Sequence, residues 1–308
     1  MAAVLPDLAA EPAPREAPFH YRLLRRLQEY VILTRLNRPI GIWLLLWPTL
    51  WALWIAGDGR PSEKVLIIFV LGTVVMRSAG CIVNDFADRN FDPHVRRTRE
   101  RPLAARRVSP IEALVVFAVL VAFALWLVTR LDPFTILLAC IGAVLTVSYP
   151  FFKRFFPAPQ FYLGLAFSWG VPMAFAAETG ALPRVCWLIF IASVVWAAIY
   201  DTLYAMVDRE DDLKIGVKST AILFADLDKL FVGAMQVVML LALALAGRSM
   251  HFGPWYYAGL TGAAVFFAYQ QWIIRNRDPA ACFRAFLNNH YAGMVIFIGV
   301  VLEYVYST

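Results

Sequence analysis

The sequence has little charge and few residues that ligate soft metals. Only 16% of its 308 residues are Asp, Glu, Lys or Arg, whereas soluble domains contain about a quarter. Its four cysteines are far apart, with no CxxC pair and no zinc-type spacing, which argues against disulfides and thiolate metal sites. The four histidines are scattered as well. Carboxylates and amides are therefore the metal ligands that this chain can offer.

Residues 1–18 lack the marks of a targeting segment. The stretch "MAAVLPDLAAEPAPREAP" is rich in alanine and proline. It has neither the basic start and apolar core of a signal peptide nor the Arg- and Ser-rich, acid-poor composition of a transit peptide. We expect residues 1–20 to form a disordered tail and residues 21–308 to form a single transmembrane domain.

Long apolar stretches are what the chain has in abundance. Hydrophobic residues make up 61% of it, and the mean hydropathy is +0.64. Apolar stretches close to bilayer length recur along the chain, which predicts an all-α membrane protein with about nine transmembrane helices. The predicted spans are 36–56, 65–84, 111–130, 132–149, 160–178, 185–207, 230–247, 253–274 and 290–306.

Lys and Arg are divided unevenly between alternate loops. The loops predicted on one side hold only five of the 28, namely Arg60, Lys64, Arg130, Arg184 and Arg248. The positive-inside rule then places the N-terminus and every acid-rich loop in the cytoplasm. We interpret the net charge of +6 as a mark of topology and of anionic ligands, not of nucleic-acid binding.

Two acidic clusters follow apolar stretches on that cytoplasmic side. The first is "NDFADRNFD", residues 84–92, and the second is "DTLYAMVDREDD", residues 201–212. At 100° per residue, the Asn and Asp side chains of the first cluster share one helical face with Arg77, provided that the helix continues past Asp88. Asp201, Asp208 and Asp212 share a face in the second cluster.

Carboxylates crowded near lipid repel one another and lack water, and a hard cation removes both costs. Ligand sets made only of oxygen suit Mg²⁺, which takes one or two carboxylates together with substrate phosphates. Two facing Asp sets are therefore expected to hold a diphosphate through Mg²⁺, with nearby arginines and lysines neutralising its remaining charge. A solvated, salt-bridged loop is the alternative for either cluster taken alone, but the duplication favours the metal site.

Both clusters resemble the motifs of the UbiA family of intramembrane aromatic prenyltransferases. The first matches N-D-x-x-D-x-x-x-D and is followed by "VRRTRERPL", residues 95–103; the second matches D-x-x-Y-A-x-x-D-x-x-D-D. The stretches at 35–54 and 159–177 are similar to the family's 4-hydroxybenzoate polyprenyltransferase branch. The resemblance implies a nine-helix bundle around a central cavity that opens to lipid and is capped by the two Asp loops.

The resemblance also implies the reaction: Mg²⁺-dependent transfer of a polyprenyl group from its diphosphate to C3 of 4-hydroxybenzoate, a step of ubiquinone synthesis. The expected catalytic residues are Asp88, Asp208, Asp201 and Arg77. Asp201 would orient the acceptor or take its proton, or it is simply a hydrogen-bonded interior carboxylate. Arg77 would hold the diphosphate or pair with an Asp. The expected metal ligands are Asn84, Asp85, Asp88, Asp92, Asp208, Asp211 and Asp212.

Further residues are expected to bind the substrates. Arg35 and Arg38 suit the acceptor carboxylate, because arginine pairs with a carboxylate through two hydrogen bonds; a plain topology anchor is the alternative. Tyr204 would face the allylic cation with its ring, or it is a packed core tyrosine. The remaining expected contacts are Tyr149, Lys153, Arg154 and Lys214.

Two other functions stay open at this point. One is prenylation of a different aromatic acceptor, of the homogentisate or dihydroxynaphthoate type. The other is transport of an anion, which intramembrane Arg77 and Asp201 would also suit. The expected location is the bacterial inner membrane, and contact with other quinone-synthesis enzymes is expected as well.

Overall fold

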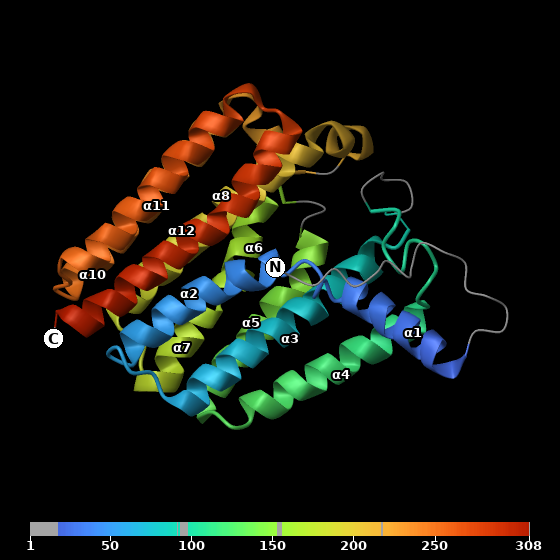
Figure 1. The fold of residues 1–308 in the computed structure, drawn as a ribbon, viewed down its shortest axis with the longest axis horizontal. Helices are drawn as coiled ribbons and strands as arrows, with labels where there is room; N and C mark the ends of the chain where they lie inside the picture. Colours follow the sequence, from blue (N-terminus) through green and yellow to red (C-terminus); the bar gives the residue numbers. More distant parts are fainter. Residues whose placement is uncertain (1–17, 91, 93–97, 153–155, 217, 308) are drawn as a thin grey trace. The chain divides into compact units, whose positions relative to one another are not determined.

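The structure is a computed structural model that describes residues 18–90, 92, 98–152, 156–216 and 218–307. The described residues form helices joined by turns and contain no strand. The helices are α1 Phe19–Leu33, α2 Ile40–Ala56, α3 Glu63–Asp88, α4 Pro110–Val128, α5 Pro133–Phe152, α6 Pro159–Ser168, α7 Gly170–Thr179, α8 Arg184–Ile215, α9 Thr220–Leu223, η2 Ala225–Leu227, α10 Asp228–Ser249, α11 Pro254–Ile273, η3 Ile274–Asn276 and α12 Pro279–Tyr306 (Figure 1).

The chain divides into two compact units. Unit 1 comprises residues 1–39 and 75–123, and unit 2 comprises residues 40–74 and 124–308. In unit 1, α1 meets the C-terminal part of α3, the loop that follows it and the first turns of α4. Its small core consists of Leu33, Ile82, Leu103, Val108 and Ala113.

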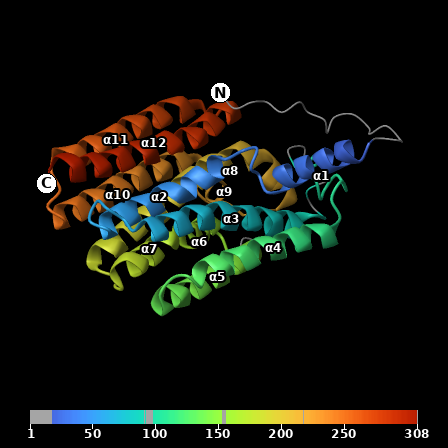
Figure 2. The same cartoon turned by 60° about the horizontal axis from the view of Figure 1, so that its bottom comes forward.

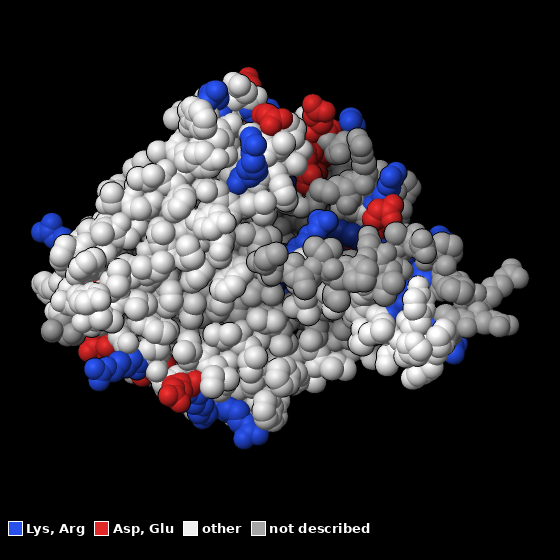
Figure 3. All heavy atoms as spheres, in the orientation of Figure 1, with Lys and Arg blue, Asp and Glu red and all other residues white. Residues whose placement is uncertain are grey.

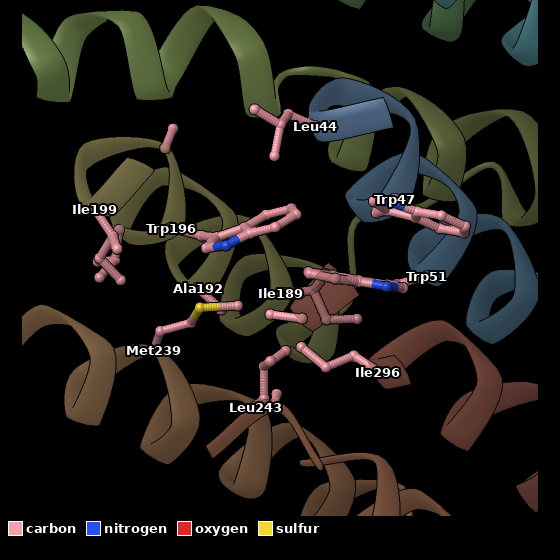
Figure 4. Packing of buried hydrophobic residues seen from close by; sticks show 14 of the residues in the cluster. Leu44, Trp47, Trp51, Ile189, Ala192, Trp196, Ile199, Met239, Leu243 and Ile296 are labelled. Atoms are coloured by element: carbon pink, nitrogen blue, oxygen red, sulfur yellow. The ribbon is translucent and has the colours of Figure 1, made fainter. Parts of the chain in front are cut away.

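Unit 2 has a larger core that is built around tryptophan. The rings of Trp51 and Trp196 lie 5.3 Å apart, and both side chains are fully buried (Figure 4). Each indole N–H has a partner on α12: Trp51 donates to the Gly293 carbonyl at 3.1 Å and Trp196 to Asn289 Oδ1 at 3.0 Å. A side chain at position 293 would collide with Trp196, so glycine lets α12 approach the indoles. The tryptophans therefore fix how α2, α8 and α12 pack together.

Helices α11 and α12 form a tight antiparallel hairpin in unit 2 (Figure 2). A Cβ added to Gly259 would lie 2.9 Å from the Gly299 Cα, so the two backbones touch midway. At one end, Glu303 accepts hydrogen bonds from the backbone N–H groups of Gly253 and Tyr256. Toward the other end, Gln270 donates to Asn288 at 3.0 Å. The hairpin is thus joined at three levels.

Five helical segments of the described chain are long and apolar enough to cross a membrane. They are Glu63–Asp88, Pro110–Val128, Arg184–Glu210, Ala225–Ser249 and Pro279–Tyr306, and Ile40–Ala56 and Pro133–Tyr149 are shorter apolar helices. On the face of unit 2 in Figure 3, a broad uncharged surface over α11 and α12 separates two charged ends. The prediction of an all-α membrane protein is confirmed. The number of spans, the central cavity, the cytoplasmic N-terminus and the single domain with its disordered tail remain predictions.

Each predicted span overlaps helix, and three of the spans differ most from the helices observed. The range 160–178 holds two helices that break at Trp169, because Pro172 has no N–H to donate to the Ser168 carbonyl. Helix α8 continues eight residues past 207, and α12 begins eleven residues before 290. The turn predicted at Asp132-Pro133 is confirmed, since Asp132 caps α5 by accepting from the Thr135 backbone N–H at 3.0 Å.

Candidate functional site

The first acidic motif lies at the C-terminal end of α3, in unit 1. Asn84 and Asp88 are one helical turn apart and half-buried, whereas Asp85 is only 1% exposed. Arg77 lies two turns earlier on the same helix and is half-buried as well. The predicted alignment of Arg77, Asn84 and Asp88 along the helix is therefore present.

Asp85 is enclosed by two arginines from outside its helix. Arg35 Nη2 lies 2.8 and 3.0 Å from the two carboxylate oxygens, and Arg101 Nη1 lies 3.0 Å from Oδ1. Arg35 follows the end of α1 with a positive φ of 59°, and its second amino group donates to the Ile32 carbonyl. A buried carboxylate needs such compensation, because burial disfavours its charged form.

Asp92 does not belong to the α3 helical face. The α-helix ends at Asp88, so the condition for placing all four motif residues on one face is not met. Instead, Arg101 Nη1 lies 3.0 Å from Asp92 Oδ2 as well as from Asp85, and thereby joins the two carboxylates. Burial raises the pKa of Asp92, and the Arg101 guanidinium opposes that rise.

The second acidic motif lies on α8, in unit 2. This helix runs unbroken for 32 residues through Asp201, Tyr204, Asp208 and Asp212, as the motif spacing predicted. It ends where Gly216 takes a φ of 71° and donates its N–H to the Asp212 carbonyl. All four motif side chains are half-buried, and the Tyr204 ring packs 4.9 Å from the Phe286 ring. That contact places Tyr204 among packed aromatics, the alternative that the sequence left open.

An ion cluster built on a buried carboxylate outside the motif, Asp228, holds the same end of α8. Asp228, the first residue of α10, is fully buried and lies 2.9 Å from Arg277 Nη2 and 3.3 Å from Arg209 Nη1. Arg277 also donates to the Asp226 carbonyl, and the bond to Asp228 raises the pKa of its guanidinium. Because Arg209 follows Asp208 directly, this cluster fixes the backbone beside a predicted site residue. Sequence reasoning missed all three residues, since their spacing of 19 and 68 positions from Arg209 carries no pattern.

The segment after α8 is tied back to it by uncharged groups. Thr202 Oγ1 and Thr220 Oγ1 are 2.6 Å apart, and the Thr220 N–H donates to Gln160 Oε1 at 3.0 Å. Ser219 caps α9 by accepting from the Ile222 N–H. The turn after the second motif is therefore anchored to both α8 and α6.

The remaining predicted residues are placed as follows. Arg38 is exposed beyond α1, Tyr149 is half-buried near the end of α5, and Lys214 is exposed in the last turn of α8. Lys153 and Arg154 lie outside the described residues, as does the side chain of Asp211. The two motifs belong to different units, so their facing each other remains a prediction.

The acidic residues fit Mg²⁺ through two oxygen pairs. Asn84 with Asp88, and Asp208 with Asp212, each offer ligands one helical turn apart, and Mg²⁺ needs only one or two carboxylates beside substrate phosphates. No group of three or more His, Cys, Asp and Glu side chains gathers among the described residues. A site completed by a phosphate ligand suits such pairs.

The model of the UbiA prenyltransferase family matches residues 45–306. This chain belongs to that family. The match covers both acidic motifs and every helix from α3 to α12.

Named relatives are similar over nearly their whole length. The 4-hydroxybenzoate octaprenyltransferase of Ectopseudomonas mendocina (strain ymp) is 56% identical over 92% of this chain and 96% of its own. The protein of the same name from Nitrosococcus oceani is 58% identical over 91% of this chain and 98% of its own.

Solved structures share the fold at lower identity. The apo structure of a UbiA homolog from Aeropyrum pernix K1 has a TM-score of 0.74 at 21% identity, and it covers 85% of this chain and 97% of its own. A UbiA homolog from Archaeoglobus fulgidus bound to GPP and Mg²⁺ has a TM-score of 0.69 at 16% identity, covering 90% of this chain and 99% of its own. The fold is thus that of a family in which Mg²⁺ and a prenyl diphosphate have been seen bound.

Proposed function

We propose that this protein transfers a polyprenyl group from polyprenyl diphosphate to C3 of 4-hydroxybenzoate, with Mg²⁺, in ubiquinone synthesis. The observation that carries the proposal is 56% identity, over 92% of the chain, to a relative named 4-hydroxybenzoate octaprenyltransferase. Both acidic motifs are complete in this sequence and lie at or near helix ends, which supports a diphosphate site. We further propose that the protein lies in the bacterial inner membrane with its Asp-rich loops in the cytoplasm, in contact with other quinone-synthesis enzymes.

The carboxylates would bind the donor. Asp88 with Asn84, and Asp208 with Asp212, are the ligands best suited to hold Mg²⁺, which when bound neutralises the diphosphate and makes it a better leaving group. Asp211 is proposed to join them. Asp85 and Asp92 each pair with arginine in this structure, so any share they take in metal binding requires these ion pairs to open.

The bond changes balance without a further reagent. The allylic C–O bond breaks and the diphosphate leaves with the electron pair. The ring carbon ortho to the hydroxyl of 4-hydroxybenzoate then attacks the allylic cation, and loss of the ring proton restores aromaticity. We propose Asp201 as the group that orients the acceptor or takes this proton, because it lies nearly two turns before Asp208 on α8. A membrane site would also keep water from the cation.

Other polar residues would orient the two substrates. Arg77 lies on the helix of the first motif and is proposed to contact the diphosphate. Arg38 is better placed than Arg35 to bind the acceptor carboxylate, because Arg35 is engaged by Asp85. Further contacts are proposed for Tyr149, Lys153, Arg154, Tyr204 and Lys214.

A single assay tests the function. Membranes containing the protein are incubated with Mg²⁺, geranyl diphosphate and, in turn, 4-hydroxybenzoate, homogentisate or a dihydroxynaphthoate, and products are identified by mass spectrometry. We expect 3-geranyl-4-hydroxybenzoate as the main product, its loss with EDTA and its return with added Mg²⁺. Membranes without the protein are the control. A faster reaction with another acceptor would overturn the acceptor assignment, and activity that resists EDTA would overturn the metal assignment.

A further inference from the structure

Helix α1 turns its leucines outward, and on its opposite side it carries three arginines and the buried Glu29. Leu23, Leu24 and Leu27 are about half exposed, whereas Glu29 is only 3% exposed. At 100° per residue these leucines occupy one side of the helix, and the arginines and Glu29 occupy the other. A helix with a leucine face and an arginine face suits the surface of a membrane, where apolar side chains reach the acyl chains.

The ionic side of α1 lines a cavity of about 270 Å³ in unit 1. Its walls are Arg22, Arg25, Arg26, Glu29 and Arg107. Four guanidinium groups and a single carboxylate therefore surround one space. Such a set favours an anion, and arginine matches the geometry of phosphate oxygens in particular.

Two of the four arginines are already neutralised. Arg107 Nε lies 2.8 Å from a Glu29 oxygen, and Arg26 Nη2 lies 2.5 Å from a Glu112 oxygen. Arg22 and Arg25 form no ion pair within the part of the chain that the structure describes. The cavity thus carries an excess of positive charge that a phosphate group would balance.

Glu112 fixes the level of this cavity in the membrane. It lies in the first turn of α4, a helix apolar enough to span, and it accepts hydrogen bonds from both Arg26 and Tyr30. Ile111 and Val115, beside it on α4, are 77% and 58% exposed, as residues facing lipid would be. The start of a spanning helix lies where hydrocarbon meets headgroups, so Arg26, which is bonded to Glu112, lies at headgroup level together with the cavity it lines.

We propose that this arginine cavity binds the phosphate of an anionic phospholipid headgroup, with the leucines of α1 resting among the acyl chains. A bilayer offers a headgroup phosphate to the arginines and, from its other lipids, acyl chains to the leucines on the opposite side of α1, whereas a free phosphate offers only the first. The site is separate from the proposed reaction, because none of its residues belongs to either acidic motif. Its role is to seat unit 1 on the membrane surface.

The test uses the full-length protein in detergent, titrated with phosphatidylglycerol or phosphatidylcholine and followed by native mass spectrometry. We expect the wild type to bind phosphatidylglycerol about 30-fold more tightly than phosphatidylcholine. Each arginine near an anionic surface contributes a factor of about five, and Arg22 and Arg25 contribute one such factor each. The variant Arg22→Gln/Arg25→Gln should lose most of this preference. Its matched control, Arg60→Gln/Lys64→Gln, removes the same charge from exposed positions at the start of α3 and in the loop before it, and should keep the preference.

Two further ligands test whether the cavity binds a phospholipid or a free phosphate compound. Glycerol 3-phosphate, which lacks acyl chains, should bind at least tenfold more weakly than phosphatidylglycerol, and inorganic pyrophosphate without Mg²⁺ should not displace the lipid. Equal binding of glycerol 3-phosphate, displacement by pyrophosphate, or an unchanged preference in Arg22→Gln/Arg25→Gln would each overturn the proposal. Because both arginines lie outside the proposed reaction site, prenyl transfer in the variant reports separately on the proposed function.

Discussion

The two acidic motifs use arginine in opposite ways. In unit 1, Arg35 and Arg101 come from outside α3 and bind carboxylates of the motif itself. In unit 2, Arg209 comes from within the motif and binds Asp228, a carboxylate that lies outside it. The first arrangement occupies motif oxygens, whereas Arg209 and Arg277 bind a carboxylate that lies outside the second motif.

This comparison distinguishes carboxylates that hold a motif in place from carboxylates that can serve as metal ligands. Asp85 is almost fully buried, so its charge must be balanced by protein groups, and its role in this structure is to anchor the end of α3. In unit 2 the equivalent anchor is Asp228, which fixes the end of α8 from a different helix. Each motif therefore has an anchoring carboxylate, and only in the first is that carboxylate part of the motif.

The largest expected effect is on catalysis. Asp88→Asn and Asp208→Asn should each slow prenyl transfer about 100-fold or more, because each removes a carboxylate proposed to hold the Mg²⁺ that neutralises the leaving diphosphate. Initial rates are measured in membranes at equal protein content. The control is Glu210→Gln, which changes an exposed residue of α8; this variant should retain the wild-type rate. A wild-type rate in one of the two Asp variants would show that only the other motif supplies an essential ligand.

A smaller effect is expected on stability, and it should be greater in unit 1. Arg101→Ala leaves Asp85 and Asp92 buried with less positive charge, and breaking a buried ion pair costs about 3 kcal/mol. The melting temperature of the purified protein should fall clearly. Arg99→Ala, which removes a 61% exposed arginine, is the matched control and should change it little. Similar melting temperatures for the two variants would show that Arg101 does not anchor Asp85 and Asp92.

The smallest effect is expected for the anchor of unit 2. Asp228→Asn keeps the shape of the side chain, and Arg277 and Arg209 are partly exposed, so water can solvate their charges. We expect a stability loss of about 1–2 kcal/mol, below that of Arg101→Ala. The KM for the prenyl diphosphate should rise more than kcat falls, because the end of α8 loses its position. The control is Asp226→Asn, which makes the same change at an exposed position two residues earlier and should leave stability and KM unchanged. An unchanged KM would mean that Asp228 serves stability alone.

Local patterns made much of the fold predictable. The spacing of Asp201, Asp208 and Asp212 predicted the helix that carries them, and apolar length located each span. Two local signals were present but not used: Pro172, which breaks the helix at Trp169, and the leucine and arginine faces of residues 19–33. Both follow from proline chemistry and helical periodicity.

The long-range ion pairs could not be predicted. Arg35 is 50 positions from Asp85, and Arg277 is 49 positions from Asp228. A carboxylate–arginine pair needs only opposite charge and proximity, so no sequence spacing distinguishes the correct partner among 28 basic residues. For that reason Arg35 was expected to bind substrate, and its bond to Asp85 became visible only in the structure.

The α11–α12 hairpin has a consequence for the surrounding lipid. Helix α12 has 28 residues, about 42 Å at 1.5 Å per residue, which exceeds the roughly 30 Å hydrocarbon core of a bilayer. A single helix of excess length tilts to fit. Because α12 is joined to α11 through Glu303, Gly299 and Asn288, it cannot tilt without its partner. The two helices therefore have to tilt together, and the stiffness of the hairpin limits how this part of the protein adapts to membranes of different thickness.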